Sequence, residues 1–190
     1  YTHDKGKYIL SLFIFALISE IPYDFLFYGK PFYADCQNVI WTLGVASLTC
    51  VAIDYFHRKP LIAIVITFIT IFLSELAGLE YGIIGVPVIV AFYYFRNKRW
   101  KQLLVSAILF CVFTMLYYLH NFGKNGFTIF GTLADSHYWY LVTLEFCGLA
   151  VWPLLFLYNG KKGKNINKWF FYLFYPGHIL FLLILSLIIF

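Results

Sequence analysis

The sequence places ionisable side chains inside long apolar runs, where such groups are costly and usually functional. His178 lies about 14 Å along the helix expected from Trp169 onward. Glu145 lies at a comparable predicted depth in another run, and Glu75 should likewise face the interior of the protein. A histidine–carboxylate pair would fix the imidazole tautomer and raise its basicity, as a general base requires. We therefore predict catalytic roles for His178 and Glu145, with a purely structural buried hydrogen bond as the alternative.

A second pair of acids closes the first apolar run. Glu20 and Asp24 are four residues apart with Pro22 between them. If the helix continues through the proline, both carboxylates lie on one face and could act together as base and hydrogen-bond acceptor. We predict both as catalytic residues. The alternative is that they only mark the end of a span at the membrane interface.

Two short polar motifs are candidates for substrate binding. The amides of Gln37 and Asn38 can donate and accept hydrogen bonds, which suits them to hold a carboxylate or a substrate amide. Helix capping is the alternative for Asn38. Glu80 and Tyr81 precede two glycines that permit close backbone approach. Small-residue helix packing would explain those glycines but not Glu80.

The basic turns could hold the phosphates of a nucleotide-like cofactor. The candidates are Arg96 and Arg99 in the turn at 96–101 and Lys161 and Lys162 in the turn at 161–168. Membrane topology alone would also explain these cations. The GKKGK stretch lacks the spacing of a phosphate-binding Walker loop. No metal is predicted, because the cysteines show no metal-ligand spacing, and free thiols are expected.

Composition defines the elements that carry these residues. The chain is 62% hydrophobic and 12% charged, with a mean hydropathy of +0.80, so lipid is its expected solvent and a soluble fold is excluded. We predict an all-α transmembrane helical bundle with about seven spans. The spans are expected at 8–28, 37–56, 61–79, 82–95, 102–120, 138–158 and 169–190. The fourth is the shortest and could be tilted or partly re-entrant.

Charge predicts the orientation. With seven spans, twelve of the fourteen Lys and Arg residues fall on one side, and only Lys30 and Lys124 fall on the other. That side is predicted to be cytoplasmic, so the C-terminus faces outward. The acids gather toward the outer side. The net charge of +5 therefore reflects topology, and nucleic acid is not needed to explain it.

Five motifs carry a family resemblance. SEIPYD, QN, LEYGIIG, YNGKKG and FFYLFYPGH, in this order, resemble the TraX family of bacterial membrane proteins, which is named for the acetylase of F-type conjugative pilin. The resemblance implies a polytopic inner-membrane protein that transfers an acetyl group from acetyl-CoA to an amine, the pilin N-terminus in the named case. It adds Tyr175 to the substrate-binding candidates and Asn159 to the cofactor-binding ones. Family members usually begin with further membrane segments, so we expect residues 1–190 to form one acyltransferase-like domain that lacks N-terminal helices.

The resulting expectation is transfer across the bilayer. Acetyl-CoA would bind from the cytoplasm and the amine acceptor from outside. Direct attack and an acetyl-histidine intermediate both remain open. Two other classes also remain: a proton- or cation-coupled transporter, which usually shows an internal repeat that this chain lacks, and a non-catalytic membrane interaction protein.

Overall fold

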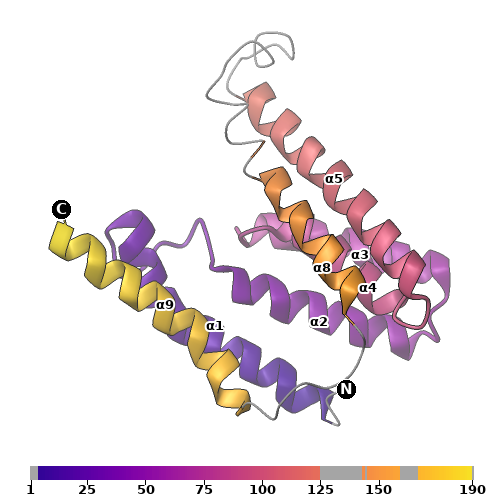
Figure 1. The fold of residues 1–190 in the computed structure, drawn as a ribbon, viewed down its shortest axis with the longest axis horizontal. Helices are drawn as coiled ribbons and strands as arrows, with labels where there is room; N and C mark the ends of the chain where they lie inside the picture. Colours follow the sequence, from indigo (N-terminus) through magenta and orange to yellow (C-terminus); the bar gives the residue numbers. More distant parts are fainter. Residues whose placement is uncertain (1–3, 125–142, 144, 159–166, 190) are drawn as a thin grey trace. The chain divides into compact units, whose positions relative to one another are not determined.

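A computed structural model describes residues 4–124, 143, 145–158 and 167–189. These residues form seven α-helices and one 3-10 turn (Figure 1). The elements are α1 (Lys5–Tyr28), α2 (Val39–Tyr55), α3 (Pro60–Leu76), α4 (Gly82–Tyr94), α5 (Arg99–Lys124), η1 (Cys147–Ala150), α8 (Val151–Leu157) and α9 (Lys168–Ile189). The all-α prediction is confirmed.

Three helices are long and apolar enough to cross a membrane. They are Lys5–Tyr28, Arg99–Tyr118 and Trp169–Ile189, with mean hydropathies of 1.8, 1.6 and 2.1. The helices Val39–Tyr55, Pro60–Leu76, Gly82–Tyr94 and Cys147–Leu157 are shorter but also apolar. The chain is therefore a helical membrane protein, and its helices overlap the predicted spans wherever those spans are described, although α5 is longer than its predicted span and the sixth span contains the η1 turn before α8.

The chain divides into two compact units, one of residues 1–86 and 162–190 and one of residues 87–161. The first unit contains α1, α2, α3, α9 and the beginning of α4. In it, α1 packs against both α2 and α9, and α2 packs against α3. The second unit contains most of α4 together with α5, η1 and α8.

The core of the first unit lies between α1, α2 and α9. Phe15 stacks on Tyr172 with ring centroids 5.1 Å apart, and its ring lies 6.2 Å from that of Trp169. Tyr175, one turn further along α9, packs on the same cluster. Figure 1 shows α9 alongside α1. The two helices run in the same direction, so the middle of α9 lies beside the second half of α1.

Polar contacts define the two ends of the first unit. At the basic end, Asp4 caps α1 by accepting a hydrogen bond from the Lys7 N–H at 3.0 Å, and Lys5 pairs with Asp54 at 2.9 Å. The Lys7 N–H holds the pKa of Asp4 below its usual value. The Lys5–Asp54 pair places the start of α1 beside the end of α2. These two helices are therefore antiparallel, as the predicted topology requires.

At the opposite end, two connections are joined by backbone hydrogen bonds. The Gln37 N–H donates to the Gly78 carbonyl at 2.7 Å, and the Glu80 N–H donates to the Gln37 carbonyl at 2.9 Å. Gly78 has φ +63°, and a Cβ there would collide with the Asp35 carbonyl oxygen. This polar end therefore brings the α1–α2 connection against the α3–α4 connection, and the approach requires glycine.

In the second unit, α5 lies beside α8 (Figure 1). The indole N–H of Trp152 lies 3.1 Å from both the Leu103 carbonyl and the Ser106 hydroxyl. The Arg99 guanidinium donates to the carbonyls of Leu155 and Phe156 at 2.9 and 2.6 Å. Arg99 thus donates to carbonyl groups in the last turn of α8, where the Leu155 carbonyl also accepts from the Tyr158 N–H at 3.3 Å.

Candidate functional site

Pro22 does not end α1, which continues to Tyr28. Glu20 and Asp24 therefore share one face of the helix, as the sequence predicted on that condition. The face is buried, with Glu20 7% exposed and Asp24 fully enclosed. Two carboxylates are thus held away from solvent in the half of α1 nearest the polar end.

Glu20 has hydrogen-bond donors on both of its oxygens. Its Oε2 accepts from the Asn38 amide at 2.6 Å and from the Trp41 indole N–H at 2.7 Å, and its Oε1 accepts from the Asn38 backbone N–H at 3.4 Å. Among the described residues, it has no ion pair with a cation. Hydrogen bonds to a charged acceptor are stronger than neutral ones, so these donors fix the position of the carboxylate without a counter-charge.

Asn38 connects Glu20 to the start of α2. Its Oδ1 accepts from the Ile40 N–H at 3.0 Å, which caps α2, and its Nδ2 also donates to the Ala16 carbonyl at 2.9 Å. The two predicted interpretations of this residue, a helix cap and a holder of a carboxylate, both apply. Asn38 is fully buried, and each of its polar atoms has a partner.

Asp24 differs from Glu20 because only one of its oxygens has a donor. Its Oδ2 accepts from the Tyr33 N–H at 2.8 Å. Its Oδ1 is buried and has no hydrogen-bond donor among the residues that the structure describes. A buried acceptor without a donor is uncommon and calls for an explanation. This oxygen can accept a hydrogen bond from a ligand. We call Glu20, Asp24, Asn38 and Trp41 the acidic site.

Phenols and a thiol lie next to the acidic site. The Tyr23 hydroxyl lies 3.6 Å from the Cys36 sulfur. The carboxylate of Glu80 lies within electrostatic range of the phenols of Tyr23, Tyr28 and Tyr175. The end of α1, both joined connections and the middle of α9 therefore converge here.

Tyr175 connects the acidic site to His178. The two rings on α9 lie 5.2 Å apart at an angle of 73°, and the imidazole also stacks on Phe174 at 5.5 Å. Its Nδ1 lies 3.3 Å from the Phe174 carbonyl oxygen. In the tautomer that donates from Nδ1 to this carbonyl, Nε2 keeps a free lone pair. A histidine in that form can accept a proton or act as a nucleophile.

Two of the carboxylates singled out in the sequence, Glu145 and Glu75, are not part of the acidic site. Glu145 belongs to the second unit and interacts electrostatically with Tyr118, so its pairing with His178 stays a prediction. Glu75 is exposed in the last turn of α3, and the prediction that it faces the interior is wrong. At the end of its helix, its carboxylate can reach water near the polar end.

The other substrate-binding candidates shape the connections. The Gln37 amide donates to the Ala34 carbonyl at 3.1 Å, within its own connection. Tyr81 has φ +59° immediately before α4 and is 45% exposed. Glu80 and Tyr175 thus gather near the acidic site with Asn38, whereas the side chain of Gln37 supports the connection.

The cofactor-binding candidates are described only in part. The Arg96 guanidinium donates to the Tyr93 carbonyl at 3.2 Å and lies over the Tyr93 ring at 4.2 Å. Arg99 caps α8, as described above. Asn159, Lys161 and Lys162 lie outside the described residues.

Sequence reasoning missed Trp41, Tyr23 and Cys36. Trp41 is three residues after Asn38 and hence on the same side of α2. A buried indole N–H needs an acceptor, and the acids in the outer half of the first predicted span, Glu20 among them, could supply one. That pairing was the available signal. The position of Cys36 depends on how the connection folds, which no local pattern reveals.

Comparison with known proteins decides the family. A family model described as TraX protein matches residues 1–186. The chain belongs to the TraX family. The match includes the acidic site and His178 of this TraX chain, and it confirms the resemblance read from the five motifs. No curated protein and no solved structure matches the chain.

Proposed function

We propose that this TraX protein transfers an acetyl group from acetyl-CoA to an amine, such as a pilin N-terminus, in the bacterial inner membrane. The observation that carries the proposal is the buried Oδ1 of Asp24, which has no hydrogen-bond donor within the part of the chain that the structure describes and lies near a second buried carboxylate, that of Glu20. A protonated amine would supply a donor to this oxygen and a positive charge beside the two acids.

The reaction needs the amine in its neutral form. The ammonium first loses a proton to Nε2 of His178, and the amine nitrogen then attacks the thioester carbonyl. A C–N bond forms, the C–S bond breaks, and coenzyme A leaves as a thiolate that takes up a proton. In the route through acetyl-histidine, Nε2 itself attacks the thioester carbonyl, the C–S bond breaks, and coenzyme A leaves as a thiolate that takes the ammonium proton. The neutral amine then attacks the acetyl group, and the bond between this group and Nε2 breaks.

The hydrogen bonds suggest separate roles for the two acids. Glu20 already accepts three hydrogen bonds, so we assign it as a positioning residue that holds Asn38 and Trp41. Asp24 has the open oxygen and is assigned to bind the ammonium group. Tyr175 contacts His178 and lies within electrostatic range of Glu20 and Glu80, which makes it a link between the base and the acidic site.

The charge distribution supports opposite approaches for the two substrates. The basic end of the first unit carries Lys5 and Arg58, and the polar end carries the acidic site. We propose that acetyl-CoA binds from the cytoplasm, that the amine binds from outside, and that the C-terminus of α9 faces outward.

Acetyl transfer can be measured with the full chain in proteoliposomes. The assay supplies acetyl-labelled coenzyme A and either a pilin-like peptide with a free N-terminal amine or the same peptide with that amine blocked. Only the free amine should be labelled. His178→Gln should lower the rate about 100-fold, the usual contribution of a general base. Ser186→Ala is the control, because this hydroxyl donates to the Leu183 carbonyl further along the same helix.

Two outcomes would reject the proposal. Equal labelling of both peptides, or a His178→Gln rate equal to that of the control, would remove the proposed chemistry. Failure to bind acetyl-CoA, together with proton or cation uptake that depends on Asp24, would instead identify a transporter.

A further inference from the structure

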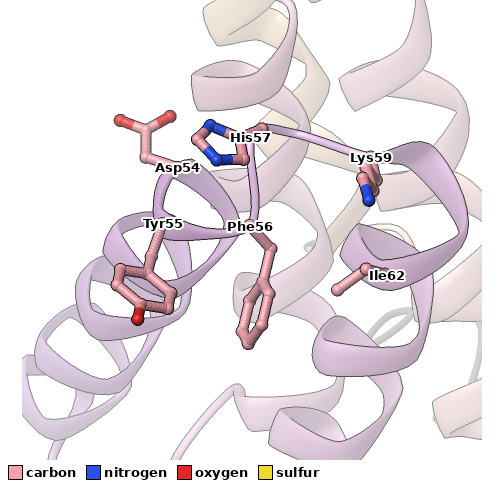
Figure 2. Close-up of a pocket in the computed structure, with 6 residues that line it drawn as sticks. All are labelled: Asp54, Tyr55, Phe56, His57, Lys59 and Ile62. Atoms are coloured by element: carbon pink, nitrogen blue, oxygen red, sulfur yellow. The ribbon is translucent and has the colours of Figure 1, made fainter.

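A cavity opens at the basic end of the first unit, at the turn between α2 and α3. Its volume is about 560 Å³, within the usual range for small-ligand sites. Figure 2 shows the residues that line it, which are Asp54, Tyr55, Phe56, His57, Lys59 and Ile62. None of these residues belongs to the acidic site, and all of them lie in or beside a single turn.

The backbone of this turn is held in an uncommon conformation. His57 and Arg58 both have φ +55°, although neither is a glycine. The Arg58 N–H donates to the Ile53 carbonyl, and the His57 N–H donates to the Asp54 carbonyl, both at 3.0 Å. A helix that ends in the left-handed region usually has glycine there. Two consecutive side-chain-bearing residues in this region are costly, and such strain is concentrated at ligand sites.

The charged side chains around the cavity are mostly cationic. The Asp54 carboxylate lies 2.9 Å from Lys5 and 3.5 Å from Arg58, so two cations already surround it. Lys59 has no ion pair with a carboxylate within the described part of the chain. Lys59 and His57 both line the cavity, and the cations Lys5, Arg58 and Lys59 outnumber the single Asp54 carboxylate there, which favours an anion.

The cavity also has an apolar wall. Phe56 and Ile62 extend on the same side of the turn in Figure 2, below Lys59. The Tyr55 ring is nearly perpendicular to that of Phe56, at 88° and 5.3 Å. A ligand that fits this lining carries anionic oxygens at one end and an apolar or aromatic part at the other.

We propose that the α2–α3 turn binds a phosphate ester, with its oxygens on Lys59 and His57 and its apolar part against Phe56 and Ile62. Two sources share this chemistry: the adenosine phosphate end of coenzyme A and the headgroup of an anionic phospholipid. The site stands whether or not the protein transfers acetyl groups, because it rests on residues at the opposite end of the unit.

The test uses the full chain in phosphatidylcholine nanodiscs. Binding of coenzyme A is measured by calorimetry, and retention of added phosphatidylglycerol is measured by native mass spectrometry. Lys59→Gln should weaken binding of one probe about fivefold, the effect of one cation near a membrane surface. His57→Asn should weaken the same probe, because asparagine accepts the left-handed backbone but lacks the imidazole.

Matched variants separate the site from general charge effects. Lys59→Arg should restore binding, because it keeps the cation. Lys30→Gln removes the same charge at the polar end, where Lys30 lies over the Tyr33 ring, and should leave both probes unchanged. If Lys59→Gln and His57→Asn weaken binding of coenzyme A, the ligand of the site is the nucleotide. If they weaken retention of phosphatidylglycerol, the ligand is the lipid headgroup. Failure of both probes to bind, or equal binding by wild type, Lys59→Gln and His57→Asn, would overturn the proposal.

Discussion

Replacing each buried acid by its amide should separate binding from folding. In Asp24→Asn, the amide oxygen can keep the hydrogen bond from the Tyr33 N–H, and the new NH₂ group takes the place of the open Oδ1. In Glu20→Gln, a single oxygen must serve three donors, so the new NH₂ group faces the Asn38 or Trp41 donors. The same chemical change therefore has opposite consequences at two positions one helical turn apart.

The magnitudes follow from the hydrogen bonds involved. A hydrogen bond to a charged group contributes about 1.5–3 kcal/mol, so loss of the ammonium contact in Asp24→Asn should weaken amine binding roughly 10- to 150-fold. Its free energy of unfolding should fall by about 1 kcal/mol or less. Glu20→Gln should lower the free energy of unfolding by about 1–3 kcal/mol, because it opposes donors with donors inside the protein.

Two measurements check this contrast in the same preparations. Denaturant unfolding in mixed micelles gives the stability, and the KM for the amine acceptor gives the binding. We expect Asp24→Asn to raise KM at nearly unchanged stability, and Glu20→Gln to lower stability. If Asp24→Asn unfolds the protein, or if it leaves KM unchanged, the open oxygen is not an amine-binding group.

Three further predictions concern the fold. Trp41→Phe should lower the free energy of unfolding by about 1 kcal/mol, because it removes the indole donor to the buried carboxylate, and denaturant unfolding measures this. Gly78→Ala should prevent normal folding, because the added Cβ would collide with the Asp35 carbonyl oxygen. The yield of monodisperse protein tests this prediction. Gly177→Ala is the control, because a Cβ at Gly177 would meet open space. The Lys7 N–H lowers the pKa of Asp4, so the cap should persist at neutral pH and be lost only as the pH falls below the ordinary carboxyl range. Hydrogen exchange of the Lys7 amide should accelerate as the cap is lost. In Asp4→Ala, the exchange should lack this pH dependence.

Periodicity and burial predicted much of this architecture. Apolar runs located the helices, because a backbone in lipid must satisfy its hydrogen bonds within the segment. The spacing of Glu20 and Asp24 predicted their common face, provided that the helix continued through Pro22. These predictions succeeded because each depends on position along a helix, which sequence specifies directly.

Other features depend on how connections fold. The path of residues 29–38 brings the Tyr33 N–H to Asp24 and Cys36 to Tyr23, and no periodic pattern encodes that path. Glu75 was misplaced because depth was counted along the chain, whereas exposure also depends on which way the last turn of α3 faces. The predicted pairing of His178 with Glu145 joins residues of two different units, and spacing along the chain does not determine the distance between them.

The paired backbone of Gln37 and Glu80 also has a mechanical consequence. The Gln37 backbone donates to the Gly78 carbonyl and accepts from the Glu80 N–H. The α1–α2 and α3–α4 connections therefore cannot move apart without breaking these hydrogen bonds. A polypeptide that displaces the α1–α2 connection, whose Tyr33 N–H binds Asp24, would also displace Glu80. The surroundings of Asp24 and Glu80 should therefore change together, even when a ligand contacts only one of the two acids.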